Sequence, residues 1–440
     1  MITIDWSSLL RATENDPQAV ARRARGEKMP SPHQHGRLAR RLLMSAALIG
    51  SIAGGAASAR GDEKMVLVAT IDVGGKGLGA FDISFVDPKL DLYVLADRTN
   101  ASVDLIDASD NTFIGRVGGF TGAVLNPNGT ANNSLSGPDG VVIVDHKEIW
   151  AGDGDSTVKV IDLKTLAIAD AISTGGQFRV DEMAWDSRDH ILAVANNADQ
   201  PPFVTLINTD SHVILGKIVF DGTNGTPNAT TTGIEQPQWS PRTGLFYVSV
   251  PQFGTDPEQG AVSVIDPNSL SLTANFPVRD CTPAGLAIGP RNEALVGCSA
   301  AFFSPPNVLS QSLILSLDNG DVVANIPQVG GSDEVWYDRG TQHYYTGSRG
   351  NQDNLGVVTP VLGTIDARTE QFDGNVLTST TAHSVAADPI SHHVFVPIGF
   401  MPPGSPEGAD PSNPCPTTGC IAVYLPSAIN DDDGGRQARR

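Results

Sequence analysis

A short apolar strand motif ending in Val-Ile-Asp recurs seven times along the chain and constrains its fold more than any other feature. The copies, four close and three looser, are Val103–Asp107, Val158–Asp162, Val204–Asn208, Val262–Asp266, Leu313–Asp318, Gly363–Asp366 and Ile421–Leu425. The position aligned with the final acidic residue falls at 107, 162, 208, 266, 318, 366 and 426, so successive copies lie 46 to 60 residues apart. A repeat of this length, built from strands alone, is typical of one four-stranded propeller blade. The sequence therefore predicts an all-β, seven-bladed β-propeller.

Each repeat has the same internal order. An inner strand is followed by an Asp-Pro or Ser-Pro turn, a second strand rich in aromatic and β-branched residues, the motif strand and an outer strand. We expect blades over 79–120, 136–175, 177–222, 233–278, 281–328, 331–378 and 381–426. The last repeat lacks its fourth strand, whereas 66–71 has the pattern of an outer strand without a repeat of its own. We expect that strand to pair into the last blade and close the ring, which removes an exposed sheet edge.

The repeat pattern resembles that of the YVTN-type family of seven-bladed bacterial β-propellers. The second strands Leu92–Val94 and Phe246–Val248 carry the resemblance together with the Val-Ile-Asp copies, and it extends over nearly all of 66–426. Blades 5 and 6 depart most from the pattern because long loops follow their second strands. The resemblance implies the fold and leaves the activity open, because propellers carry many unrelated functions.

The first 59 residues have the features of an export signal. Arg40 and Arg41 precede the apolar run 42–56, and Ala57–Ala59 matches a cleavage site. The arginine pair fits a twin-arginine signal in part and an ordinary secretory signal about as well. We expect an upstream extension over 1–28, a propeller over 60–428, a disordered tail over 429–440, and a periplasmic or secreted protein without a membrane span.

Charge and cysteine usage agree with export. Of 29 basic and 49 acidic residues, 1–59 hold eight and four, so the remainder carries 21 and 45 and a formal net charge of −24. That balance argues against nucleic acid as a partner. We expect a monomer, with disulfides Cys281–Cys298 across one hairpin and Cys415–Cys420 around a short loop. The sequence has no Walker loop, G-x-S-x-G elbow or CxxCH site, so we expect neither a nucleotide nor a haem cofactor.

One position of each inner strand gathers titratable side chains. Aligning the blades on their first turns places seven residues in register: Asp82, Asp139, Asp181, Glu235, Ala284, Asp333 and His383. Inner strands line a propeller's channel, so these side chains should converge on one mouth. The next residue along in four blades is polar, namely Glu182, Gln236, Glu334 and Ser384. Because neighbouring strand residues point to opposite faces, these could brace adjacent blades instead of facing the channel.

Two interpretations of this ring stay open. Gathered carboxylates repel one another unless a cation binds or protons are shared. Asp82, Asp139, Asp181, Glu235, Asp333 and His383 are therefore candidate ligands of a divalent cation. An oxygen-rich set favours Ca²⁺ or Mg²⁺, and the histidine admits Mn²⁺ or Zn²⁺. The structural alternative is a hydrated rim whose carboxylates accept backbone hydrogen bonds.

Loops on the same side add candidates for ligand binding. Arg98 and Arg349 could clamp a carboxylate ligand, or form salt bridges to the acidic rim. Asp153 and Asp155 form a partial calcium-loop pattern. Phe302, Phe303, Phe400 and Met401 could form an apolar lip, although capping the ends of the blades is the simpler role.

Two classes of function follow from these residues. The first is an exported binding propeller that takes a small molecule or a protein partner at the acidic funnel, with a divalent cation as candidate cofactor. The alternative is a metal-dependent hydrolase, lactonase or lyase similar to gluconolactonase-type propellers. There His383 would be the candidate general base.

Overall fold

The computed structural model describes residues 64–427 except 231, 257, 300–309, 354 and 402–411. These residues fall within the second of the two compact units into which the chain divides, 62–440. The expected export signal over 1–59 and the expected tail over 429–440 lie outside the described residues. No helix in the described part of the chain is long and apolar enough to cross a membrane.

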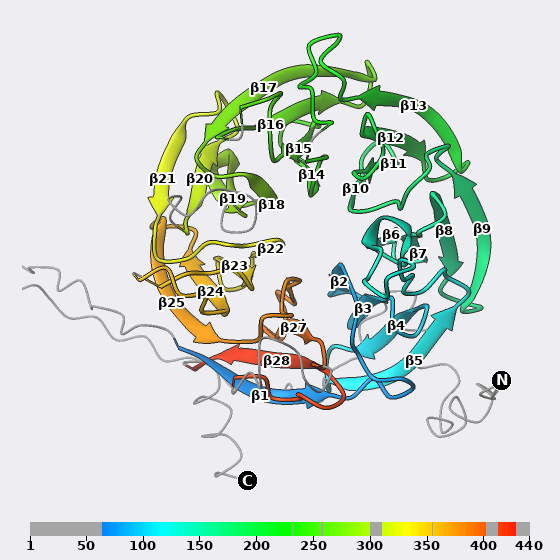
Figure 1. Ribbon diagram of the computed structural model, residues 1–440, viewed down its shortest axis with the longest axis vertical. Coiled ribbons are helices and arrows are strands. Elements are labelled where there is room, and N and C mark those ends of the chain that lie inside the picture. The colour runs from blue at the N-terminus through cyan, green and yellow to red at the C-terminus, as the bar shows by residue number, and fades with distance from the viewer. Residues whose placement is uncertain are drawn as a thin grey trace, which may run out of the picture. The chain divides into compact units, whose positions relative to one another are not determined.

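Seven four-stranded antiparallel sheets surround a central axis, which confirms the predicted seven-bladed β-propeller (Figure 1). Blade 1 contains β2 (Ser84–Asp87), β3 (Leu92–Asp97), β4 (Ser102–Asp107) and β5 (Thr112–Gly118). Blade 2 contains β6 (Val141–Val144), β7 (Glu148–Gly152), β8 (Thr157–Asp162) and β9 (Ala167–Ser173). Blade 3 contains β10 (Met183–Asp186), β11 (Ile191–Asn196), β12 (Phe203–Asn208) and β13 (Val213–Val219). Blade 4 contains β14 (Pro237–Trp239), β15 (Phe246–Val250), β16 (Gln259–Asp266) and β17 (Ser271–Arg279). Blade 5 contains β18 (Pro283–Ile288), β19 (Glu293–Cys298), β20 (Ser312–Ser316) and β21 (Val322–Ile326). Blade 6 contains β22 (Val335–Asp338), β23 (His343–Ser348), β24 (Val361–Asp366) and β25 (Gln371–Leu377).

The seventh blade joins the two ends of the described chain. Its strands are β26 (Ala386–Ala387), β27 (Val394–Ile398) and β28 (Cys420–Pro426), and β1 (Met65–Ile71) is the fourth. Strand β1 pairs antiparallel with β28, from Met65 opposite Pro426 to Ile71 opposite Ile421. Figure 1 shows these two strands side by side. The ring therefore closes as the orphan strand at 66–71 predicted.

The Val-Ile-Asp motif has two structural roles, which the first two blades illustrate. Ile106 is buried at a register shift between the third and fourth strands, and Ile161 repeats this in the next blade. The acidic residue that follows accepts backbone N–H bonds from the next turn: Asp107 from Ser109 at 2.9 Å, Asp162 from Thr165 at 2.7 Å. Such local side-chain bonds stabilise tight turns. Where a copy keeps its acidic residue, as in these two blades, the motif thus encodes one core residue and one turn.

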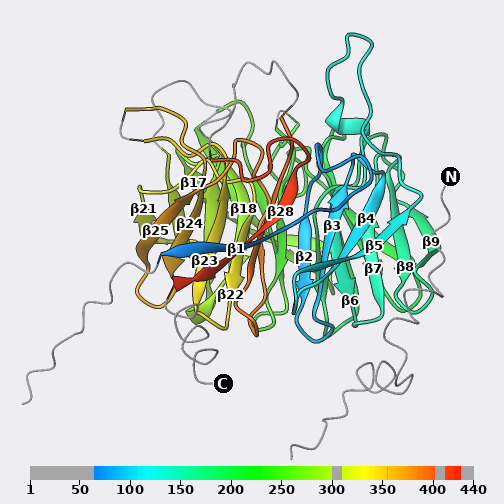
Figure 2. The same ribbon diagram turned by 90° about the horizontal axis from the view of Figure 1, so that it is seen from below.

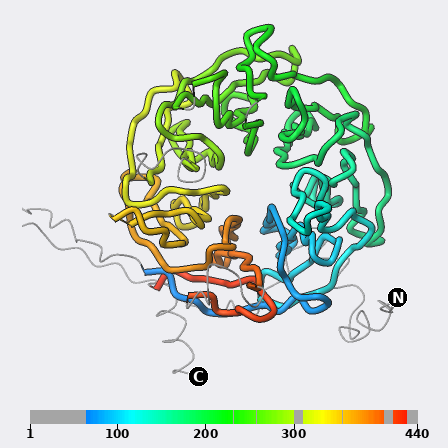
Figure 3. The backbone as a smooth tube through the Cα atoms, in the orientation of Figure 1, coloured from blue at the N-terminus to red at the C-terminus, as the bar shows by residue number. Residues whose placement is uncertain are grey.

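The hydrophobic core lies between neighbouring blades. One cluster joins Val94 and Leu105 of the first blade to Val141 and Ile149 of the second. Outer strands are mostly exposed on one face, as the alternating burial of β13 shows. The tube in Figure 3 follows the chain from blade to blade in sequence order around the ring. Because each blade needs two neighbours to bury its faces, closing the ring also completes the core.

The inner strands all run in the same direction along the channel, so their first residues meet at one mouth. The loop between β5 and β6 rises beyond the blades on one side and carries a short 3₁₀ helix, η1 (Asn133–Leu135) (Figure 2). A second, η2 (Pro290–Asn292), lies in the turn between β18 and β19. Neighbouring inner strands come very close, since a Cβ on Gly140 would lie 2.0 Å from the carbonyl oxygen of Asp181.

Both expected cysteine pairs are bonded. Cys281 and Cys298 join across the β18–β19 hairpin, with Cα atoms 4.5 Å apart, and Cys415 joins Cys420. No described cysteine is free. Disulfides persist mainly in oxidising compartments, which agrees with export of the chain.

Candidate functional site

The aligned position of the inner strands contributes five of the sixteen residues that line one cavity at the channel mouth. This charged cavity has a volume of about 340 Å³ and includes five of the seven aligned residues: Asp82, Asp181, Glu235, Asp333 and His383. The other two, Asp139 and Ala284, are buried and do not line it. Sequence alignment of the blades therefore predicted that these five side chains meet, although not the partners of the carboxylates.

Arg98 follows β3 and binds two of the carboxylates. Its Nε donates to Asp139 Oδ1 at 2.7 Å, and its Nη2 contacts both Asp139 and Asp82. Burial alone would raise the pKa of Asp82. The opposing effects of Arg98, His383 and Arg179 together outweigh burial, so the pKa of Asp82 lies well below the usual range. Burial raises the pKa of Asp139 well above the usual range despite the same arginines. Arg98 therefore links the carboxylate of Asp82, which lines the charged cavity, to the buried carboxyl group of Asp139, which does not.

Arg179 is the functional candidate that sequence reasoning missed. Its Nη2 lies 2.6 Å from Asp181 Oδ2, its Nη1 lies 3.5 Å from Asp82 Oδ2, and its Nε donates to Asn197 at 3.3 Å. Its side chain is only 16% exposed. Burial raises the pKa of Asp181 to about 6, although Arg179 opposes this. The sequence feature that could have identified Arg179 is its position two residues before the aligned Asp181, because residues two apart in an extended segment face the same side.

Arg349 forms the third arginine pair, at the more open rim. Its Nη2 donates to Asp333 Oδ2 at 2.7 Å, and both side chains are about one-third exposed, at 34% and 30%. Arg98, Arg179 and Arg349 come from blades 1, 3 and 6 and all line the charged cavity. Guanidinium groups from different blades thus alternate with the carboxylates.

His383 is held by two oxygen acceptors. Its Nδ1 lies 2.9 Å from the carbonyl oxygen of Thr381 and its Nε2 lies 3.3 Å from Asp82 Oδ1. Its ring stacks on Phe81 with 4.7 Å between centroids. Both ring nitrogens therefore face oxygen atoms of the protein, and this arrangement suits a positioning contact with Asp82 better than a general base.

Two of the four polar residues one step further along form the floor of the charged cavity. Glu182 and Glu334 line it, from blades 3 and 6. Gln236 of blade 4 donates from Nε2 to Glu334 Oε2 at 2.9 Å and accepts from the Leu286 backbone N–H at 2.6 Å. Ser384 of blade 7 likewise accepts from the Ser84 backbone N–H of blade 1 at 3.1 Å. Gln236 and Ser384 therefore brace adjacent blades, as expected, whereas Glu182 and Glu334 line the charged cavity.

The two floor carboxyls share protons. Burial raises the pKa of Glu334 to about 8, and burial together with the charge of Glu334 raises the pKa of Glu182 well above the usual range. A hydrogen bond joins the two carboxyls. Burial and the charges of Asp181 and Asp333 likewise raise the pKa of Glu235 well above the usual range. Several carboxyls of this cavity therefore stay protonated near neutral pH.

The carboxylates do not gather around one point as metal ligands would. Among the residues that the structure describes, no group of three or more His, Cys, Asp and Glu is arranged to hold a metal ion. Asp82, Asp181 and Asp333 each bind a guanidinium instead. As placed, this donor set does not fit Ca²⁺ or Mg²⁺, whose sites need six or more converging oxygens or several bound waters. The divalent cation stays a prediction.

The remaining sequence candidates have structural partners or lie outside the description. Asp153 accepts from the Thr121 backbone N–H at 3.0 Å and binds Lys159 Nζ at 2.5 Å, so it fixes a loop. A Cβ on Gly79, a residue of the cavity wall, would lie 2.7 Å from the Phe400 ring. Met401 follows it and is half-buried. Phe302 and Phe303 lie outside the described residues.

Comparison with known proteins supports the fold. No protein-family model matches the chain, and no curated protein matches it. Among 1636 matching chains of solved structures, one described as "Structure of U3-55K" has a TM-score of 0.55 and 10% sequence identity. The match covers 82% of this chain and 98% of that one. At that identity the similarity shows a β-propeller fold alone.

Proposed function

We propose that this chain is an exported binding propeller that holds a small, neutral, polyhydroxylated ligand, such as a sugar or polyol, in the charged cavity. The observation that carries the proposal is the convergence of three arginines from three blades with carboxyl groups around about 340 Å³. Sugar hydroxyls both donate and accept, so they match a wall that alternates guanidinium donors with carboxylate acceptors.

Charge balance favours a neutral ligand. Three arginines face carboxyls of which Asp181, Glu182, Glu235 and Glu334 have raised pKa values, so protonation offsets much of the formal negative charge. A strongly charged ligand would have to displace an existing ion pair such as Arg98 with Asp82. The salt bridges also fix the side chains before binding, which lowers the entropic cost of association.

The hydrolase, lactonase or lyase alternative receives less support from the geometry. It needs a base with a free lone pair and a metal with an open position. His383 instead faces two oxygen acceptors, and the carboxylates face arginines. We keep binding as the proposed function and a cation-assisted reaction as its rival.

A calorimetric titration tests the proposal. Neutral mono- and disaccharides should produce saturable binding heat, whereas succinate and putrescine should not. The variant Arg349→Ala/Asp333→Ala removes one donor–acceptor pair of the rim without changing the net charge. It should weaken binding about tenfold or more, since the loss of one hydrogen bond to a charged group costs about 1.5 kcal/mol or more.

The matched control is Arg279→Ala/Glu258→Ala. It removes an exposed ion pair with 3.1 Å between Arg279 Nη2, on the outer strand β17, and Glu258 Oε2, in the loop between β15 and β16. Binding should be unchanged in the control. If no neutral polyol binds, or if both double variants weaken binding equally, the charged cavity is not the binding site.

A further inference from the structure

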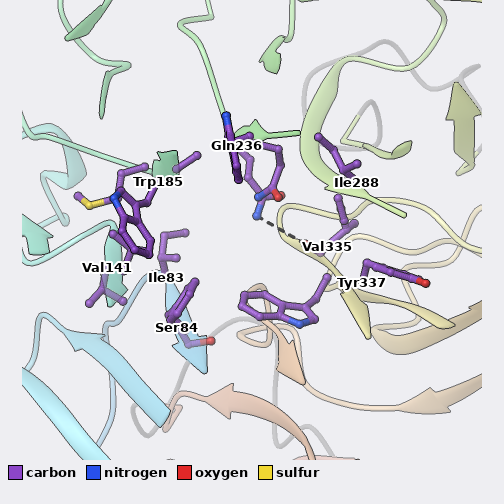
Figure 4. A pocket seen from close by; sticks show the side chains of 16 residues that line it. Ile83, Ser84, Val141, Trp185, Gln236, Ile288, Val335 and Tyr337 are labelled. Atoms are coloured by element: carbon purple, nitrogen blue, oxygen red, sulfur yellow. Dashed lines mark hydrogen bonds between the residues drawn. The ribbon is translucent and has the colours of Figure 1, made fainter. Parts of the chain in front are cut away.

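A second cavity lies at the opposite end of the channel from the charged cavity. This aromatic chamber has a volume of about 250 Å³ and is lined from the inner strands of six blades, β2, β6, β10, β14, β18 and β22. Its aromatic walls come from five residues: Phe85, Trp185, Trp239, Trp336 and Tyr337. Figure 4 shows Trp185, Gln236 and Tyr337 around it, on different blades.

The lining of the aromatic chamber differs chemically from that of the charged cavity. Three of the four tryptophans in the described part of the chain meet here, and none of the sixteen lining residues is charged. Polar groups come from the amides of Gln236 and Gln238 and the Ser84 hydroxyl. A charged ligand would lose its hydration without gaining a counter-charge, so the chamber selects a neutral one.

The aromatic walls are held in place by neighbouring side chains. Trp336 meets Phe85 edge to face, with 5.5 Å between centroids. The Arg188 guanidinium lies over the Trp239 ring at 5.5 Å, and Trp185 meets His190 edge to face at 6.5 Å. Each of the three tryptophans is also half-buried against the core between blades. The chamber is therefore formed before any ligand enters, as small-molecule sites usually are.

A polar partition separates the two cavities. Gln236 lines the aromatic chamber while its Nε2 donates to Glu334, a residue of the charged cavity, at 2.9 Å. The same nitrogen lies 3.5 Å from the carbonyl oxygen of Val335, the contact drawn in Figure 4. Ligands at the two mouths therefore contact different side chains, and each site is testable alone.

We infer that the aromatic chamber is a second binding site, for a small neutral aromatic molecule of one or two fused rings. Indole, phenol and phenyl walls favour a planar ring, since edge-to-face and offset contacts add about 0.5–1.5 kcal/mol beyond the buried area. The volume is just below the range of about 300–1,000 Å³ of drug-sized pockets, which limits the ligand to about two rings. The amides of Gln236 and Gln238 can bind a hydroxyl substituent.

The probe is 2-naphthol, titrated calorimetrically against the purified protein beside its saturated counterpart, decahydro-2-naphthol. Both carry one hydroxyl on a two-ring frame, so their comparison isolates aromaticity. We expect saturable binding of 2-naphthol with a negative heat-capacity change, as burial of apolar surface requires. The saturated alcohol should bind about tenfold more weakly, the factor that one aromatic contact supplies.

Two variants locate the site. Trp239→Leu removes an aromatic wall, and Ala184→Leu fills the chamber from β10 while keeping every tryptophan. Each should weaken 2-naphthol binding about tenfold or more. The control is Phe253→Leu, which changes an aromatic residue that is 41% exposed in a loop outside the chamber. Thermal melts verify folding, and Ala184→Leu keeps the test valid if Trp239→Leu fails to fold.

Three results would overturn the inference. The first is the absence of binding heat up to the solubility limit of 2-naphthol. The second is equal binding of the aromatic and saturated alcohols, which would make the chamber a generic apolar hole. The third is unchanged binding in the folded Ala184→Leu variant. Sugar binding by the same samples reports on the charged cavity, so failure of either proposal is distinguishable from failure of the other.

Discussion

Replacing Arg179 by methionine should destabilise the propeller in a pH-dependent way. The substitution keeps an apolar stem and removes the guanidinium that lies 2.6 Å from Asp181 and 3.5 Å from Asp82. At 16% exposure the arginine is largely shielded from water. Removing one partner of a buried ion pair leaves an uncompensated charge and costs about 3–5 kcal/mol. We use the lower figure, about 3 kcal/mol, because Asp82 keeps Arg98 as a partner.

The expected shift in melting temperature follows from the size of the domain. Unfolding entropy of about 2.1 cal/mol/K per residue gives about 0.8 kcal/mol/K for roughly 360 propeller residues. A loss of about 3 kcal/mol then lowers the melting temperature by about 4 °C at pH 8. The exposed Arg279→Met control should shift it by about 1 °C or less.

The dependence on pH has a definite sign. The pKa of Asp181 in the folded protein is about 6, above its ordinary value of 3.8. A raised carboxyl pKa favours the folded state at low pH, and that contribution is lost as pH rises through about 4 to 6. Without Arg179 the pKa rises further, so the variant should lose more stability at pH 8 than at pH 5. Differential scanning calorimetry at both pH values measures this.

Adding Asp181→Asn to Arg179→Met should restore part of the loss at pH 8, because the unpaired carboxylate is gone. An equal loss at pH 5 and pH 8, or a loss no larger than that of the Arg279→Met control, would show that Arg179 does not neutralise these carboxylates.

Three further outcomes are expected. Wild-type stability should fall as the pH rises from about 4.5 to 8, since the pKa of Glu334 rises from 4.5 to about 8 on folding. The urea-denaturation midpoint should depend less on pH over that range in Glu334→Gln, and as strongly as in the wild type in the exposed control Glu258→Gln. Gly140→Ala should lower the midpoint strongly because its Cβ would lie 2.0 Å from the Asp181 carbonyl oxygen, whereas Gly118→Ala, with its nearest atom at 3.9 Å, should be tolerated. Ca²⁺ or a chelator should leave the melting temperature unchanged if arginines neutralise the funnel; a rise with Ca²⁺ would favour the cation hypothesis instead.

The position of the site could be predicted because a repeat converts sequence alignment into spatial alignment. Asp82, Asp181, Glu235, Asp333 and His383 were placed at one mouth by counting from the first turn of each blade, and they line one cavity. The pairing of these carboxylates with arginines was harder to predict from the sequence. A ring of carboxylates whose arginine partners are unknown suggests a metal site, and Arg179 precedes β10 at a position where the other blades have no matching arginine.

The sequence by itself determined the number of blades, the closure of the ring and the mouth at which titratable groups gather. These follow from local periodicity, because every blade repeats the same order of apolar strands and turns. Only the tertiary structure decided which charges pair and which side chains cross the channel. Gln236 and Glu334 are separated by 98 residues and a whole blade, yet lie 2.9 Å apart. Contacts across the axis depend on the radius of the closed ring and on side-chain conformation, which no local pattern records.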